Sequence, residues 1–173
     1  MQEKLRKEIN EVLREHNNEI TYEAVMNMKY LYMVINETLR MYPPLPFLNR
    51  ICVNDYRLPN SDIVIENGTK IIFPIQGLHY DPEYFPEPYQ FNPERFSAEN
   101  KAQIPPYTFM PFGDGPRNCI GDRFAKQQIR VGLACVIRKY RFRLNPKVKV
   151  PLEFDTTTFI RAKDDILLDV ETV

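Results

Sequence analysis

The sequence has few cysteines and few histidines. Its three cysteines, Cys52, Cys119 and Cys135, are odd in number and form no C-x-x-C pair, which argues against a disulfide framework and a structural zinc site. A reducing compartment is therefore expected. The two histidines, His16 and His79, lack metal-ligand spacing, so we interpret His79 as a structural residue.

The sequence also lacks an excess of charge and a long apolar run. Twenty-three Lys and Arg residues balance twenty-three Asp and Glu residues, so nothing in the net charge indicates a nucleic-acid partner. No stretch approaches the roughly eighteen apolar residues of a membrane span, and the first residues do not resemble a signal peptide. We expect this chain by itself to be soluble.

Helical periodicity dominates residues 1–42 and 120–140. Leu5, Ile9 and Val12 share one face of the first helix, and Thr21 is placed to cap a second. Because the sequence starts inside a helical pattern, we expect it to be truncated. In the helix over 120–140, the residues expected to pack inward are Phe124, Ala125, Gln128, Val131, Ala134 and Cys135.

Between and after these helices the pattern changes. Residues 47–76 contain β-branched runs that predict a small sheet, with Asn67 and Gly68 as a turn. Residues 80–118 hold eight of the fifteen prolines and predict a long meander, which is unusual unless functional. Alternation over 141–173 predicts terminal antiparallel strands, one of them at 159–160.

The most informative segment, residues 112–125, reads FGDGPRNCIGDRFA. It delivers Cys119 to the start of a predicted helix. Amide groups at a helix start and a nearby arginine, Arg117, stabilise a thiolate, so Cys119 is suited to metal ligation at neutral pH. Three glycines remove side chains around the sulfur, as a large flat ligand requires: Gly113, Gly115 and Gly121. Haem is such a ligand, and cysteine thiolate is one of its axial partners.

Five residues of this segment match the signature Phe-x-x-Gly-x-Arg-x-Cys-x-Gly: Phe112, Gly115, Arg117, Cys119 and Gly121. The whole chain resembles the cytochromes P450, and is most similar to microsomal insect members that act on foreign compounds. A chance match has odds on the order of one in ten thousand or rarer. The alternative is an inert buried cysteine beside a glycine turn.

The resemblance implies a fold class that is mostly α with small β-sheets (α+β), of which residues 1–173 are the incomplete, C-terminal haem-binding part. Residues 112–125 would form the haem-thiolate loop, with Cys119 as the axial ligand of haem iron. The resemblance implies these cofactor-binding residues: Cys119, Arg117, Arg50, Phe112, Gly113, Gly115, Gly121 and Ala125. Arg50 and Arg117 would pair with haem propionates; the alternative for Arg50 is an ordinary strand arginine.

The resemblance further implies a structural network behind the loop. Glu37 and Arg40 lie three residues apart on one predicted helix, and Arg95 supplies a third member from Pro-Glu-Arg-Phe. Without the resemblance, such a pair would be read as a solvated contact worth well under about 1 kcal/mol.

By resemblance, the function is insertion of one oxygen atom from O2 into small hydrophobic substrates. Electrons would come from NADPH through NADPH-cytochrome P450 reductase, at the cytosolic face of the endoplasmic reticulum membrane. The family's membrane anchor and central oxygen-activation helix do not occur in this chain. Lys126, Arg130 and Arg123 are expected to form a positive surface for the reductase, or else an ordinary solvated helix face. Phe47, Leu48 and the turn over 156–159 are expected to touch substrate.

Two other functions remain open. The chain is alternatively a non-catalytic fragment or relic without activity of its own, because the parts that shape a substrate pocket are missing. A haem-thiolate sensor or isomerase would use the same loop without oxygen insertion.

Overall fold

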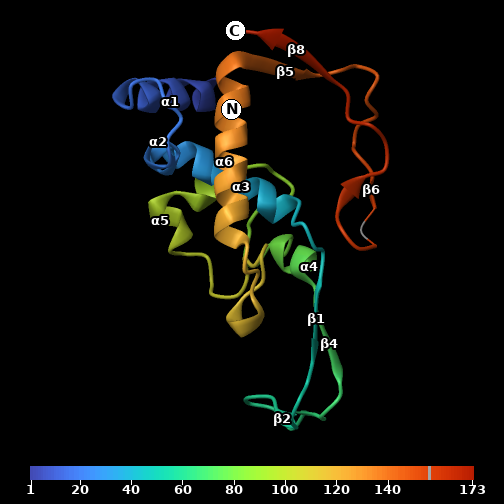
Figure 1. Ribbon diagram of the computed structural model, residues 1–173. Helices are drawn as coiled ribbons and strands as arrows, with labels where there is room; N and C mark the ends of the chain where they lie inside the picture. The colour runs from blue at the N-terminus through green and yellow to red at the C-terminus, as the bar shows by residue number, and fades with distance from the viewer. Residues whose placement is uncertain (156) are drawn as a thin grey trace.

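A computed structural model describes residues 1–155 and 157–173 (Figure 1). The long helix α6 (Asp122–Lys139) forms the spine of the helical part. Three earlier helices pack against it: α1 (Gln2–Glu15), α2 (Tyr22–Asn27) and α3 (Lys29–Met41). Small antiparallel two-stranded sheets lie outside this bundle. The predicted fold class, helices with small sheets, is confirmed.

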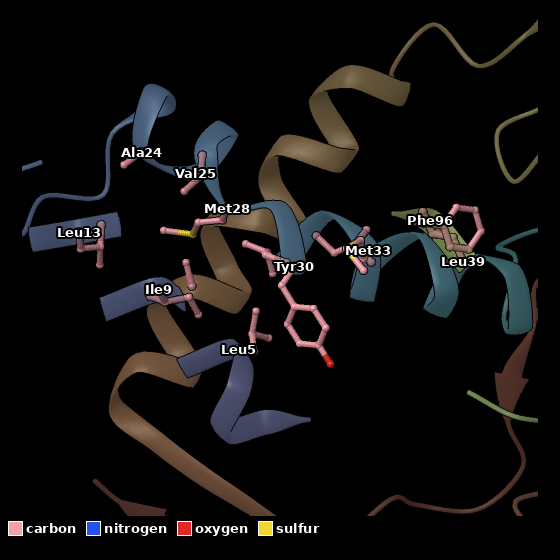
Figure 2. Packing of buried hydrophobic residues seen from close by; sticks show 13 residues of the cluster. Leu5, Ile9, Leu13, Ala24, Val25, Met28, Tyr30, Met33, Leu39 and Phe96 are labelled. Atoms are coloured by element: carbon pink, nitrogen blue, oxygen red, sulfur yellow. The ribbon is translucent and has the colours of Figure 1, made fainter. Parts of the chain in front are cut away.

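The core lies between α1, α2, α3 and α6. On α1, Leu5, Ile9 and Leu13 recur at intervals of four residues, so they share one face, and all three are buried. Figure 2 shows these side chains beside Val25 of α2 and Met28, the residue before α3. Full burial of each aliphatic side chain stabilises the fold by about 1.5 to 3 kcal/mol.

The first backbone N–H groups of α2 and α3 find their hydrogen-bond acceptors in two different ways. Thr21 accepts a hydrogen bond from the Ala24 N–H through its hydroxyl at 3.1 Å, which confirms the predicted cap. Helix α3 has no cap from its own N-cap side chain. Instead the Glu8 carboxylate of α1 accepts from the N–H groups of Tyr30 at 2.6 Å and Leu31 at 2.9 Å.

A residue of α1 donates hydrogen bonds to backbone carbonyls at the C-terminal end of α6. The buried Arg6 donates from Nε to the Ile137 carbonyl at 2.9 Å and from Nη2 to the Tyr140 carbonyl at 2.7 Å. Carbonyls in the last turn of a helix have no partner within it, and a cation there also complements the helix dipole. Charged side chains of α1 therefore form hydrogen bonds with the backbone of both α3 and α6.

Within the predicted sheet region 47–76, residues 48–73 form an arm that extends away from the helices (Figure 1). Strand β1 (Leu48–Ile51) pairs with β4 (Lys70–Phe73), and β2 (Tyr56–Arg57) pairs with β3 (Val64–Ile65). The arm thus holds two separate ladders, where the sequence predicted one small sheet. Asn67 and Gly68 form a turn, but β3 and β4 on either side of it do not pair with each other.

Short helices interrupt the proline-rich residues 80–118. Helix α4 (Ile75–His79) precedes this segment, and within it lie η1 (Pro93–Phe96), α5 (Ala98–Lys101) and η2 (Gly115–Arg117). Proline is tolerated at the start of such turns because the first N–H groups have no partner within the helix. The one-turn helix η1 packs against α3.

After α6, strand β5 (Tyr140–Leu144) pairs with β8 (Leu168–Thr172), and β6 (Phe154–Asp155) pairs with β7 (Arg161–Ala162). The strand predicted at 159–160 is wrong, because pairing resumes only at Arg161. The Asp155 carboxylate accepts from the Thr157 N–H at 3.0 Å and from Arg161 at 3.0 Å. Residues 157–159 form a bend instead of a strand.

The prediction of which α6 face packs inward is largely wrong. Ala134 is buried and Ala125 half-buried, but Phe124 is 72% exposed, and Gln128, Val131 and Cys135 are exposed as well. In particular, Cys135 is not in the core. Helices α1 to α3 cover a different side of α6, where Leu133 and Ile137 pack. The stripe of the six predicted residues therefore stays largely open.

Among the helices of the described residues, none combines the length and the apolar character that crossing a bilayer requires.

Candidate functional site

The cysteine loop is closed by backbone hydrogen bonds. The Cys119 N–H donates to the Phe112 carbonyl at 2.9 Å, and the Gly113 N–H donates to the Met110 carbonyl at 3.0 Å. Gly113 and Gly115 have φ values of 75° and 76°, a region that favours glycine because other residues have a Cβ there. The loop needs glycine at these two positions to deliver the cysteine to α6.

The Cys119 side chain is exposed and has apolar neighbours. Ile120 and Phe124, next to it in sequence and in the first turn of α6, are also exposed. A Cβ added at Gly121 would lie 4.0 Å from the Cys119 sulfur, so glycine keeps that side of the sulfur clear. An exposed thiol bordered by apolar side chains suits a large apolar partner that binds through sulfur.

Two arginines reach a neighbouring hollow. Arg50 of β1 and Arg117 of η2 line one open hollow of about 1110 Å³, together with apolar residues of the arm. The other lining residues are Asn49, Ile51, Val53, Lys70 and Ile72. A Cβ added at Gly113 would lie 3.4 Å from Leu48 Cδ1 and 4.0 Å from Arg50 Nη2, so Gly113 packs against both residues of β1. The hollow suits an apolar group that carries carboxylates.

These features fit haem. Haem has apolar faces, carboxylate groups and an iron that accepts a thiolate, and the residues present offer apolar surface, two arginines and one exposed cysteine. Within residues 1–155 and 157–173, no group of three or more His, Cys, Asp and Glu residues is placed to hold a metal ion. An iron bound here would therefore depend on Cys119 and on the ligands that its own macrocycle supplies.

The remaining predicted site residues lie around the loop. Ala125 is half-buried in the first turn of α6, and its N–H donates to the Gly121 carbonyl at 2.8 Å. Phe112 is half-buried, and the Lys126 ammonium lies 5.0 Å from the centre of its ring. Phe47 is exposed beside β1. Thr156, in the turn expected to touch substrate, lies outside the described residues.

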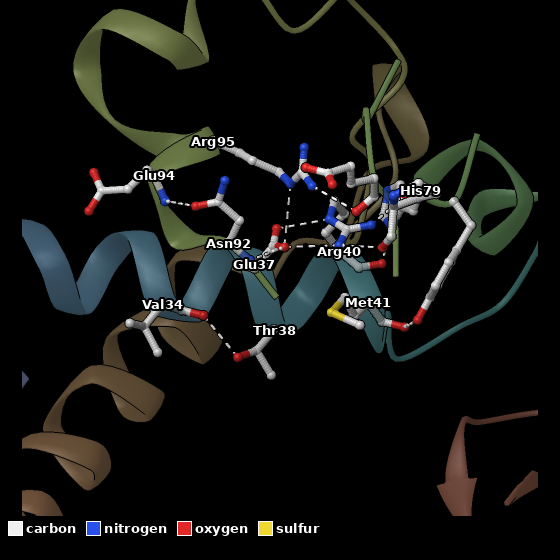
Figure 3. A network of polar contacts seen from close by, with 12 residues as sticks. Val34, Glu37, Thr38, Arg40, Met41, His79, Asn92, Glu94 and Arg95 are labelled. Atoms are coloured by element: carbon white, nitrogen blue, oxygen red, sulfur yellow. Dashed lines mark hydrogen bonds and ion pairs between the residues drawn. The ribbon is translucent and has the colours of Figure 1, made fainter. Parts of the chain in front are cut away.

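Glu37 and Arg40 form a fully buried ion pair on α3 (Figure 3). Arg40 donates from Nε and Nη2 to the two carboxylate oxygens of Glu37, at 2.8 and 2.9 Å. Arg40 also donates to the carbonyls of His79 at 2.7 Å and Pro88 at 2.8 Å. The guanidinium thus joins α3 to α4 and to the meander, and both charges are compensated where no water reaches them.

Arg95 joins this pair from η1. Its Nε lies 3.6 Å from Glu37 Oε1, an ion-pair distance without a hydrogen bond, and its Nη2 donates to the Glu87 carbonyl at 2.9 Å. The Asn92 N–H donates to Glu37 Oε1 at 2.8 Å. The structure therefore brings together Glu37, Arg40 and Arg95, the three residues that the resemblance grouped.

His79 belongs to the same region, a placement that the sequence did not reveal. It is fully buried, with Nδ1 3.0 Å from the Arg40 carbonyl and Nε2 3.1 Å from the Met110 N–H. Burial lowers the pKa of His79 from 6.5 to about 4, so the ring is neutral at pH 7. The one available signal was its position before the Tyr-Asp-Pro segment, which does not identify its partners.

Comparisons with known proteins bear on the family of the chain. A family profile described as Cytochrome P450 matches residues 1–170. The chain is similar to Probable cytochrome P450 6a23 of Drosophila melanogaster, with 46% identity over 172 residues, which cover 99% of this chain and 34% of the relative. It is also similar to Cytochrome P450 6k1 of Blattella germanica, with 44% identity over 162 residues, which cover 94% and 31%. The chain spans about a third of the length of these curated relatives.

Proposed function

The chain belongs to the cytochrome P450 family, and from this premise we propose that it forms the thiolate side of the haem site of a monooxygenase. The proposed reaction inserts one oxygen atom from O2 into small hydrophobic substrates, with electrons from NADPH. The observation that carries the proposal is the exposed Cys119 in a glycine-bordered loop, next to a hollow that Arg50 and Arg117 line. When bound, haem supplies the oxygen activation, which thiolate ligation favours.

In this proposal the residues of the chain bind and orient the cofactor. Cys119, exposed just before the start of α6, would hold the iron through its sulfur. Arg117 and Arg50 pair with the carboxylates, which need a cation once removed from water. The backbone and side chains against which the macrocycle would lie are those of Phe112, Gly113, Gly115, Gly121 and Ala125.

Glu37, Arg40 and Arg95 have a structural role in the proposal. Their bonds tie α3, α4 and the meander together behind the cysteine loop. Because the buried Glu37 carboxylate faces both arginines, the network would favour one arrangement of these segments. None of the three residues is proposed to touch the reacting atoms.

The proposed electron donor is NADPH-cytochrome P450 reductase at the cytosolic face of the endoplasmic reticulum. Arg123 is exposed in the first turn of α6, and Lys126 and Arg130 are half-buried. Lys126 pairs with Asp122 at 3.4 Å, and Arg130 lies 5.5 Å from the centre of the Tyr32 ring. Lys126 lies beside Phe112 of the loop and Arg130 lies over α3, and together with Arg123 they would steer an acidic partner.

A second candidate is a fragment without activity of its own. The chain spans about a third of its relatives' length, and the open stripe of α6 includes Phe124 and Val131. For the isolated 173 residues we therefore propose weak haem binding and no turnover.

The test of the proposed function uses the complete protein that contains this chain. It is combined with haem, the reductase, NADPH and an apolar test substrate under isotopically labelled O2. One labelled oxygen atom in the product supports the proposal. Haem bound through thiolate without any labelled product would instead identify a sensor or an isomerase.

A further inference from the structure

The imidazole of His79 bridges two segments that are far apart in the sequence. Its Nδ1 lies 3.0 Å from the carbonyl of Arg40 on α3, and its Nε2 lies 3.1 Å from the N–H of Met110. A carbonyl can only accept and an N–H can only donate. The ring therefore carries its proton on Nδ1 and accepts from Met110 at Nε2, which is possible only for neutral histidine.

This bridge is rigid on both sides. Figure 3 shows His79 beside Arg40, whose guanidinium donates back to the His79 carbonyl at 2.7 Å. The ring also contacts Phe109, with centroids 5.2 Å apart, and Phe85 at 6.2 Å. Because His79 is fully buried, removing Nε2 takes away the protein acceptor of the Met110 N–H.

From Met110 a short series of backbone bonds leads to the cysteine. The Met110 carbonyl accepts from the Gly113 N–H at 3.0 Å, which sets the turn that opens the loop. The Phe112 carbonyl, inside that turn, accepts from the Cys119 N–H at 2.9 Å. The position of the Met110 backbone therefore affects the position of the Cys119 backbone through these two hydrogen bonds.

We propose that His79 is a positioning residue for Cys119: by accepting the Met110 N–H, it anchors the cysteine loop to the buried Glu37 and Arg40 pair and sets where the sulfur lies. The inference rests on the proposed function, because its consequence for iron requires Cys119 to be the axial ligand. His79 itself touches neither cofactor nor substrate in this account.

Two substitutions separate this role from a general contribution to folding. In His79→Gln, the amide oxygen extends about as far as Nε2 and can still accept from Met110. In His79→Asn, the shorter amide keeps a donor near the position of Nδ1, for the Arg40 carbonyl, but does not reach Met110. Both replacements are polar, neutral and smaller than or similar to histidine.

The experiment measures the absorption spectrum of the reduced, CO-bound complete protein, loaded with haem. The strongly red-shifted band gives the ratio of protein whose haem is ligated by thiolate to protein whose haem is not. We expect His79→Asn to lower this ratio about tenfold, as loss of one buried hydrogen bond implies, and His79→Gln to remain within about twofold of wild type. His16→Asn is the matched control, since His16 is on the far end of α1 and contacts Asn27.

Each outcome decides the inference. The inference is supported if His79→Asn lowers the band ratio or the haem content and His79→Gln does not. Equal behaviour of the two variants, both unaffected or both defective, overturns it and leaves the proposed function standing. Absence of the red-shifted band from wild type overturns the proposed function, and the role of His79 with it.

Discussion

At the scale of single residues, the buried Glu37 carboxylate makes the sharpest stability prediction. Glu37→Ala leaves Arg40 in the interior without its carboxylate partner and frees the Asn92 N–H. We expect a loss of about 3 to 5 kcal/mol in the free energy of unfolding, because an uncompensated buried charge remains. Denaturant unfolding of the complete protein measures this, and its haem content should fall in parallel.

The control for this variant is Glu94→Ala. Glu94 is half exposed and pairs with Lys4 at 2.8 Å, so its removal should change stability by less than about 1 kcal/mol. Normal haem content in Glu37→Ala would refute the structural role of the network.

The buried His79 predicts how stability depends on pH. Its pKa is about 4 in the folded protein, because of burial, and 6.5 when solvated. Between pH 4 and pH 6.5 the unfolded state binds more protons than the folded state. The contribution of neutral His79 to the free energy of unfolding is therefore fully present above pH 6.5 and is lost as the pH drops toward 4. The full effect is about 3 kcal/mol. Urea unfolding at pH 7 and pH 5 should show a smaller drop for His79→Gln than for wild type; equal drops would contradict the assignment.

Single residues also show what sequence can and cannot predict. Five spaced residues of the cysteine loop were enough to predict Cys119 as the ligand, because the chemistry needs them at fixed positions. Cys135 was predicted to be in the core and is exposed. Helical spacing tells which residues share a face, but not whether another element covers that face. His79 was recognised as structural, yet its partners Arg40 and Met110 lie 39 and 31 residues away.

At the scale of elements, the start of α3 depends on a carboxylate from another helix. Glu8→Ala removes the acceptor for the N–H groups of Tyr30 and Leu31. We expect a loss of about 1 to 2 kcal/mol in stability, as for other caps at helix starts. Equilibrium unfolding of the complete protein checks this value. Glu11→Ala is the control, because Glu11 only faces Lys7 at 3.9 Å on the exposed side of α1; an equal cost for both variants would contradict the cap.

The helices were easier to predict than the pairing of strands. Periodicity and the prolines after residue 42 located α1, α2 and α3, since both signals are local. The cap from Glu8 has no local signal, because it acts across 22 residues. In the arm, the turn at Asn67 and Gly68 was found, but pairing of β4 with β1 depends on the three-dimensional path of the chain.

At the scale of the whole molecule, the open stripe of α6 predicts the behaviour of the isolated chain. Residues such as Phe124 and Val131 share that stripe and are exposed. If haem lies beside them with one face in water, each 100 Å² of apolar face left uncovered forfeits about 2.5 kcal/mol of binding free energy. Haem titration should therefore give a much weaker affinity for the isolated 173 residues than for the complete protein. Equal affinities would show that this chain alone makes the haem site.

The central claim is that the sulfur of Cys119 binds haem iron, and one spectrum tests it most directly. The complete protein and its Cys119→Ser variant are reduced and exposed to CO. Wild type should show the strongly red-shifted main band of a thiolate opposite CO, and the variant should lose it, since a serine hydroxyl does not replace a thiolate. An unchanged red-shifted band in Cys119→Ser would contradict the account.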